Sequence, residues 1–150
     1  MTSELRVDKE VHTVRLLLED GSDATATIYV PIGIGGPANP HAVIDAIEQA
    51  DGALPCRDEH SRFVLVGVDA LCGVVCGQDD VPSDGFFTRH LVDVRLRGGH
   101  EFSGQLLHDV GAGDRMSDAF RYSRGWLQME VDDELLWFRK TALVVATEAG

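Results

Sequence analysis

The sequence predicts a mainly β fold made of two copies of one small unit. The first observation is a repeated hairpin pattern, in which an apolar run, a two-residue turn and a second run occupy 92–107 and, 78 positions earlier, 14–29. The turns are Gly98-Gly99 and Asp20-Gly21. Such pairs favour hairpins whose two central turn residues have positive φ. We therefore expect an internal duplication.

The second observation is that the match continues beyond the hairpin. Asp45-Ala46-Ile47 matches Asp118-Ala119-Phe120 at an offset of 73 positions, and Val74-Val75 matches Val144-Val145 at an offset of 70. The falling offset places insertions in loops of the first copy, where insertions are tolerated. Each copy is thus expected to be a strand-strand-helix-strand-strand-strand unit.

The elements of the first copy follow from local patterns. Apolar runs and alternation predict strands at 12–18, 24–30, 53–57, 63–68 and 71–76. A short helix is expected after Asn39-Pro40-His41, because Asn is a good N-cap and Pro suits the first helical position. Gly52 provides a natural end to that helix.

The second copy repeats this order. Its hairpin at 92–107 is followed by a helix over 115–124, capped by Asp114 and ended by Gly125, and then by strands at 126–131, 135–138 and 141–146. The turn-rich acidic stretch 78–85 has the composition of a linker. The predicted domains are therefore 5–77 and 86–148.

Five short strands with one small helix are most simply closed as a small barrel of the SH3 or Sm type. In the second copy, Arg115-Met116-Ser117-Asp118-Ala119-Phe120, Gly125-Trp126-Leu127 and Arg139-Lys140-Thr141 resemble a little-characterised bacterial family of Sm-like or SH3-like small-barrel domains. That family's signature reads Arg-Leu-Ser-Asp-x-Leu-Asn, and here Arg or Tyr stands where its Asn is expected. The first copy keeps only Asp45 of the signature. The resemblance implies no catalytic residues.

Composition limits the classes of function. The 150-residue chain is 44% hydrophobic and carries a net charge of −12, which repels phosphate backbones and makes nucleic acid an unfavourable partner. The beginning of the sequence has no apolar segment of a secretory signal, and no apolar run reaches the roughly 18 residues of a membrane helix. Three cysteines suggest no disulfide framework. We expect a cytoplasmic protein that does not bind membranes.

Cys56, His60, Cys72 and Cys76 are the weak candidates for a metal site, since thiolate and imidazole can hold zinc tetrahedrally. Against this, the cysteines fall at apolar positions of expected strands, and free Cys behaves as a small buried hydrophobe. Residues i and i+4 of a strand are also about 13 Å apart, too far for one metal to bridge. We expect buried cysteines, no metal and no cofactor.

The loop Gly33-Ile34-Gly35-Gly36 lacks the spacing of a dinucleotide loop and the Gly-Lys of a P-loop, so a connector is the simpler interpretation; whether it binds anything stays open. No nucleophile elbow is present. Ser103 and Glu101 are expected on one strand face and His100 on the other. We therefore expect no enzyme activity.

Both copies retain an acidic residue at the helix, Asp45 and Asp118. Each carboxylate could accept nearby backbone N–H groups, contact a partner, or pair with a basic residue such as Arg115. The large aromatic residues are the other candidates for partner binding, because an outward-facing Trp would anchor the other barrel or a second protein. They are Phe86, Phe87, Trp126 and Trp137. Phe86-Phe87 is expected at the junction between the copies.

The sequence thus predicts a non-catalytic protein-binding or self-assembling scaffold module, whose contacts use sheet edges and outward aromatic side chains. Its expected partner is another protein or a second copy of itself in a homodimer. The alternatives are a metal- or small-ligand-binding sensor that uses Cys56, His60 or the glycine loop, and an Sm-like RNA-binding module. The RNA-binding alternative requires a basic or aromatic groove.

Overall fold

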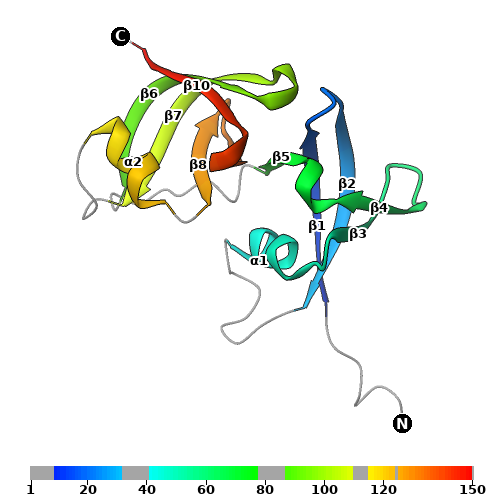
Figure 1. Ribbon diagram of the computed structural model, residues 1–150. Coiled ribbons are helices and arrows are strands. Elements are labelled where there is room, and N and C mark those ends of the chain that lie inside the picture. Colours follow the sequence, from blue (N-terminus) through cyan, green and yellow to red (C-terminus); the bar gives the residue numbers. More distant parts are fainter. Residues whose placement is uncertain (1–8, 32–40, 78–86, 110–114, 124, 150) are drawn as a thin grey trace.

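A computed structural model describes residues 9–31, 41–77, 87–109, 115–123 and 125–149. The protein is mainly β, as expected, with few helices, and the strands of the described residues form one open antiparallel sheet (Figure 1). The expected linker at 78–85 and the glycine loop at 33–36 lie outside the described residues.

The described residues of the first half form five strands and one α-helix. They are β1 (Lys9–Leu18), β2 (Asp23–Pro31), α1 (Ala42–Gln49), β3 (Ala53–Arg57), β4 (Phe63–Gly67) and β5 (Leu71–Cys76). A single 3₁₀ turn, η2 (Val68–Ala70), links β4 to β5.

The same element types follow in the same order in the second half. They are β6 (Phe87–Leu96), β7 (Glu101–Asp109), α2 (Met116–Tyr122), β8 (Trp126–Val131), β9 (Glu134–Arg139) and β10 (Leu143–Glu148). The 3₁₀ turns η4 (Arg97–Gly99) and η6 (Lys140–Ala142) lie in the β6–β7 turn and before β10.

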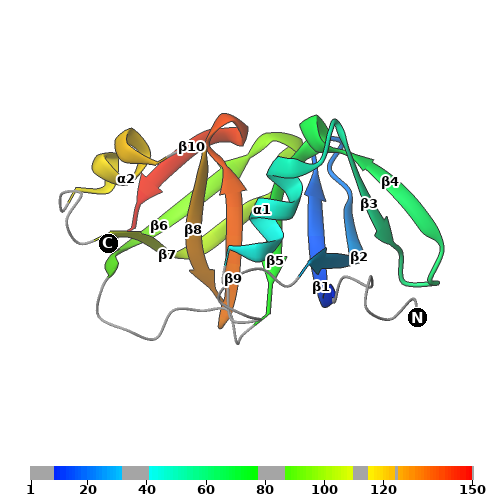
Figure 2. The same cartoon turned by 90° about the horizontal axis from the view of Figure 1, so that it is seen from below.

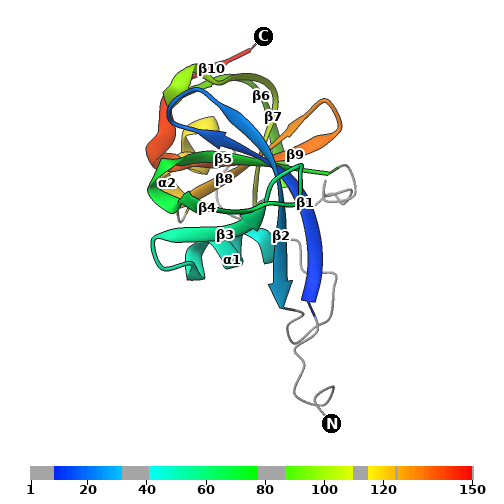
Figure 3. The ribbon, with the colours of Figure 1, turned by 90° about the vertical axis from the view of Figure 1, so that its right-hand side faces the viewer.

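The strand order across the sheet is β10-β6-β7-β8-β9-β5-β1-β2-β3-β4. The first half contributes β5-β1-β2-β3-β4 and the second contributes β10-β6-β7-β8-β9, so the two halves have corresponding strand orders. Pairing of β5 with β9 joins them, and β10 and β4 are the two edge strands. Figures 2 and 3 show how strongly the sheet bends along its length, with α1 beside the region where the halves meet.

Two hydrophobic clusters form the core, and each contains residues of both halves. The first cluster is built mainly from β1 to β5 and α1, but it includes Leu107, Leu135 and Trp137 of the second half. The second cluster is built mainly from β6 to β9, α2 and the start of β10, but it includes Leu17 and Val75. Because each core is completed by side chains from the other half, the halves are packed into one body.

The two hairpin turns differ from the expectation of matching two-residue turns. Gly98 and Gly99 both have positive φ, as expected, whereas in the first hairpin only Gly21 does, although both hairpins have four-residue connections, 19–22 and 97–100; Asp20 occupies the position that corresponds to Gly98. The turns touch: a Cβ added at Gly98 would lie 2.8 Å from the carbonyl oxygen of Leu18. Strand β6 also begins at Phe87, five residues before the expected hairpin.

The helices are shorter than predicted, and their N-caps differ. α1 begins at Ala42 with His41 at the N-cap position, and α2 begins at Met116 with Arg115 there; neither N-cap side chain makes a capping hydrogen bond. Asn39 and Asp114, the expected caps, lie outside the described residues. No helix in the described part of the chain is long and apolar enough to cross a membrane.

Candidate protein-binding surface

Hydrogen-bond registers identify which positions of the two halves correspond. Strand β1 pairs with β5, and β6 pairs with β10, with an irregularity at the same place in both ladders. Leu18 pairs with Leu71 and Leu96 pairs with Leu143, so β5 and β10 correspond at an offset of 72 positions. This offset of 72 replaces the offset of 70 positions at which the sequences of these strands were matched. Cys72 and Cys76 therefore correspond to Val144 and Glu148.

The hairpins β3–β4 and β8–β9 correspond in the same way. Ala53 pairs with Gly67 in the first, and Trp126 pairs with Arg139 in the second. Positions of β4 and β9 therefore correspond at an offset of 72, which matches Leu65 with Trp137 and Phe63 with Leu135. In β2 and β7 the hairpin offset of 78 matches Tyr29 with Leu107.

In the second half, this set of positions is covered by the first half. Leu107, Leu135 and Trp137 are 3%, 0% and 4% exposed and belong to the first cluster. The ring of Trp137 meets that of His41, at the start of α1, edge to face with centroids 5.2 Å apart. The outer side of β7 to β9 is therefore buried by β5, α1 and their neighbours.

In the first half, the corresponding positions are exposed. Tyr29, Phe63 and Leu65 are 48%, 61% and 61% exposed. Exposed Val11 pairs with Tyr29 across β1–β2, and exposed Pro55 pairs with Leu65 across β3–β4. We call these five residues the β4 patch. Large exposed apolar patches on a folded protein mark binding surfaces.

The β4 patch contains a shallow pocket of about 290 Å³ lined by Tyr29, Pro55, Cys56, Arg57 and Phe63. The Arg57 guanidinium lies 5.9 Å from the centre of the Phe63 ring, within range of a cation–π contact. The pocket thus combines two aromatic rings and one cation with apolar lining residues at the edge of the sheet.

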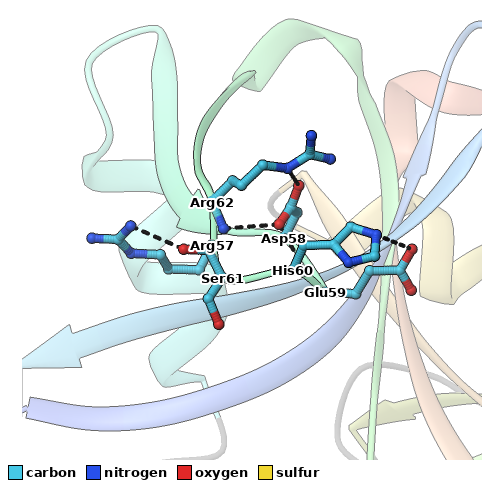
Figure 4. A network of polar contacts seen from close by, with 6 residues as sticks. All are labelled: Arg57, Asp58, Glu59, His60, Ser61 and Arg62. Atoms are coloured by element: carbon cyan, nitrogen blue, oxygen red, sulfur yellow. Dashed lines mark hydrogen bonds and ion pairs between the residues drawn. The ribbon is translucent and has the colours of Figure 1, made fainter.

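The β3–β4 turn beside the patch is held by Asp58 (Figure 4). Its carboxylate accepts hydrogen bonds from the backbone N–H groups of His60 and Arg62, each at 2.9 Å, and from Arg62 Nε at 2.8 Å. These bonds, led by the one from the Arg62 backbone N–H, lower the pKa of Asp58 below its ordinary value. The Arg57 guanidinium donates to the carbonyl of Ser61 at 3.1 Å. Hydrogen bonds within residues 57–62 thus stabilise the turn.

The opposite edge of the sheet also exposes apolar side chains. Val144 and Val145 of β10 and Leu91 of β6 are exposed. A pocket of about 510 Å³ lies where β6, β7 and β10 meet, and Arg95, Phe102 and Val145 are among its lining residues. Within the described residues, both ends of the sheet thus present a strand with one unpaired edge and exposed apolar side chains.

The predicted partner-binding tryptophans are both in the junction between the halves. Trp137 is buried, because both faces of β9 are covered: its own side by the first cluster, and the side of Leu136 and Phe138 by the second. Trp126 packs against the first cluster, its indole N–H donates to Glu48 of α1, and its ring lies 5.2 Å from the Arg139 guanidinium. They contact the other half, one of the two roles considered for an outward Trp.

Phe87 contacts the first half, whereas Arg115 and Asp118 contact each other. Phe87 begins β6, is partly buried and packs against the first cluster; Phe86 lies outside the described residues. The Asp118 carboxylate accepts the backbone N–H of Arg115 at 3.2 Å, and Asp118 N–H donates to the Arg115 carbonyl at 3.0 Å. Asp118 thus accepts a backbone hydrogen bond at the start of α2, which is one of the roles that the sequence suggested for it.

The candidate metal ligands are not brought together. Cys56, Cys72 and Cys76 are buried, whereas His60 is exposed in the β3–β4 turn. No group of three or more His, Cys, Asp or Glu residues within the described ranges could hold a metal ion. Burial raises the pKa of the Cys56 and Cys72 thiols, which disfavours the thiolate that binds metals.

Sequence reasoning missed Tyr29, Phe63 and Leu65 as candidates for binding. In a strand, Phe63 and Leu65 lie on one face and Val64 and Val66 on the other. Alternation alone does not say which of two apolar faces is covered. Their correspondence to buried residues of the second half becomes visible only with the registers of the sheet.

The chain matches no protein-family model, no curated protein and no solved structure.

Proposed function

We propose that this chain is a non-catalytic protein-binding module and that the β4 patch is its binding surface. The observation that supports this most directly is the contrast between corresponding positions. Leu107, Leu135 and Trp137 are buried by a neighbouring β unit, whereas Tyr29, Phe63 and Leu65 are exposed. An edge strand with an apolar face offers a partner both backbone hydrogen bonds and buried area.

The proposal includes a finer description of the fold. Each half is a small barrel of the SH3 or Sm type, with strand order β5-β1-β2-β3-β4 or its counterpart β10-β6-β7-β8-β9. The separate hydrophobic cluster at the centre of each half supports this description. Cys56 and Cys72 are buried free thiols, which suits the reducing cytoplasm in which we place the protein.

RNA binding is the competing class of function for the same surface. Tyr29 and Phe63 could stack on bases, and Arg57 could contact a phosphate. We favour protein because the patch also contains aliphatic Val11 and Leu65, and because the net charge of −12 opposes a polyanion.

Photo-crosslinking in living cells tests the proposal. A photoreactive phenylalanine analogue replaces Leu65 in one variant and Gln49, an exposed residue of α1, in the control. We expect protein adducts at position 65 at least several times more abundant than at position 49. Equal yields at both positions would contradict the proposal, and ribonuclease-sensitive adducts at position 65 would favour RNA instead.

A further inference from the structure

We infer that the occupant of the β4 patch is the β10 edge of a second copy of this chain, so that copies join head to tail. This inference rests on the proposed function and specifies its partner. It follows from the β5–β9 junction, where an edge strand of one half pairs with an edge strand of the other. β10 corresponds to β5, and β4 corresponds to β9. The free edges are therefore the same two kinds of edge that meet inside the chain.

The internal pairing fixes the expected register between copies. Within the chain, Val74 pairs with Trp137 and Cys76 pairs with Leu135. At the offset of 72 positions, Ala146 of one copy then lies opposite Leu65 of the next, and Glu148 lies opposite Phe63. The strands run antiparallel, as β5 and β9 do.

The surface formed by β10 and α2 corresponds to the surface of the first half that buries Trp137, but its residues are less fully buried. In the first half, that surface includes four fully or nearly fully buried residues, Val43, Ile47, Leu71 and Val74. Their counterparts in the second half are only partly buried against the second cluster. These counterparts are Met116, Phe120, Leu143 and Ala146.

In the part of the chain that the structure describes, the same correspondence therefore leaves a donor surface and an acceptor surface uncovered at opposite ends of one sheet. The bare donor surface is β10 with α2, and the bare acceptor surface is the β4 patch. Burying apolar area on both sides, together with backbone hydrogen bonds along two unpaired edges, favours association.

Charge also fits the inferred register. Glu148 is exposed at the end of β10, and its expected position opposite Phe63 places it beside Arg57 and Arg62 of the next copy. The guanidinium groups of these arginines are on exposed side chains of the β3–β4 hairpin. An exposed pair of this kind adds little affinity but helps to set register.

A head-to-tail contact uses different surfaces on the two partners. Every open assembly therefore keeps one free β4 edge at one end and one free β10 edge at the other, and association continues until a ring closes or a filament grows. A symmetric dimer would instead use the same edge twice. The two arrangements respond differently to variants blocked at one edge.

The experiment uses two variants of the full chain, each blocked at one edge. Leu65→Glu places a charge in the β4 patch, and Val145→Lys places a charge on β10; both positions are exposed, so both variants should fold. Sedimentation velocity is measured on the wild type, on each variant alone and on their equimolar mixture. Thermal unfolding of each variant checks that the fold is retained, with Thr147→Pro as a second block of β10.

We expect the wild type to assemble and each variant alone to remain a monomer, with self-association weakened by about a hundredfold. The mixture should form a dimer and nothing larger, because the intact β10 of Leu65→Glu can still pair with the intact β4 of Val145→Lys.

Three results would overturn the inference. Self-association of either variant alone would indicate a symmetric contact, and a mixture that stays monomeric would exclude β10–β4 pairing. A monomeric wild type at all concentrations would exclude a second copy as the partner. In that last case, protein adducts at position 65 would still support the proposed function, whereas their absence would remove that function as well.

Discussion

Trp137 and Leu65 occupy corresponding positions in two hairpins of one chain, yet Trp137 is buried between the halves and Leu65 is exposed. Alanine substitution should therefore have opposite consequences at the two sites. Trp137→Ala empties a packed site and should reduce the free energy of unfolding by about 3–5 kcal/mol. Leu65→Ala should change it by no more than about 0.5 kcal/mol in dilute protein.

Urea denaturation of both variants at low protein concentration measures this difference. Comparable losses for the two variants would mean that Leu65 is also covered within a single chain. That outcome would contradict the assignment of the β4 patch as a free surface.

Gly98 and Gly99 offer a matched pair for testing the contact between the two hairpin turns. Both have a positive φ near 85°, so alanine at either position should cost about 1 kcal/mol in backbone strain. A Cβ at Gly98 would also lie 2.8 Å from the Leu18 carbonyl oxygen, whereas one at Gly99 would have no atom within 4 Å. We expect Gly98→Ala to lower the melting temperature clearly more than Gly99→Ala. Equal shifts would argue that the two turns are not in contact.

Local sequence patterns predicted several elements well. The strands at 53–57, 71–76 and 126–131 have the predicted bounds, because turn residues and short apolar runs mark them at both ends. Trp137 illustrates what such patterns leave open. An outward-facing Trp could anchor the other barrel or a second protein, and the pairing of β9 with β5 shows that the first half covers it.

The pairing of β5 with β9 at the junction between the halves could not be predicted from the sequence, for a physical reason. Gly73 pairs with Phe138, which lies 65 positions later in the sequence, and nothing local in either strand specifies the partner. The β4 patch was missed for the same reason: Phe63 and Leu65 differ from buried strand residues only in what lies over them.

The Asp132-Asp133 turn between β8 and β9 is a site where stability can be gained. Both residues have positive φ, 49° and 66°, in a two-residue turn. Asn-Gly is favoured in this conformation, so the double substitution Asp132→Asn and Asp133→Gly should stabilise the fold by about 1 kcal/mol. Calorimetry measures the gain. The control replaces both residues by Asn, which removes the same charges; if it stabilises equally, charge rather than backbone conformation is the cause.

The three cysteines should be unreactive in the folded protein. All are buried, and burial raises the pKa of Cys56 and Cys72, so less of the reactive thiolate is present at neutral pH. A thiol-reactive disulfide reagent should label none of them until denaturant is added, and then all three. Thr141→Cys, at an exposed position, provides the reactive control. Rapid labelling of a native cysteine would revive the metal- or ligand-sensing alternative.

Asp58 should make the stability of the fold depend on pH. Its pKa is lower in the folded chain than in the unfolded one, mainly because the Arg62 backbone N–H donates to its carboxylate. The folded state therefore binds this proton less readily, so the stabilisation is present above the unfolded pKa and is lost as pH falls through the folded value. Asp58→Asn should lower stability at neutral pH and flatten its decline in acid, as followed by urea denaturation across pH. Arg62→Lys retains the backbone N–H and should keep most of the pH dependence; if it flattens the profile as much as Asp58→Asn, the guanidinium, and not the backbone bond, controls the turn.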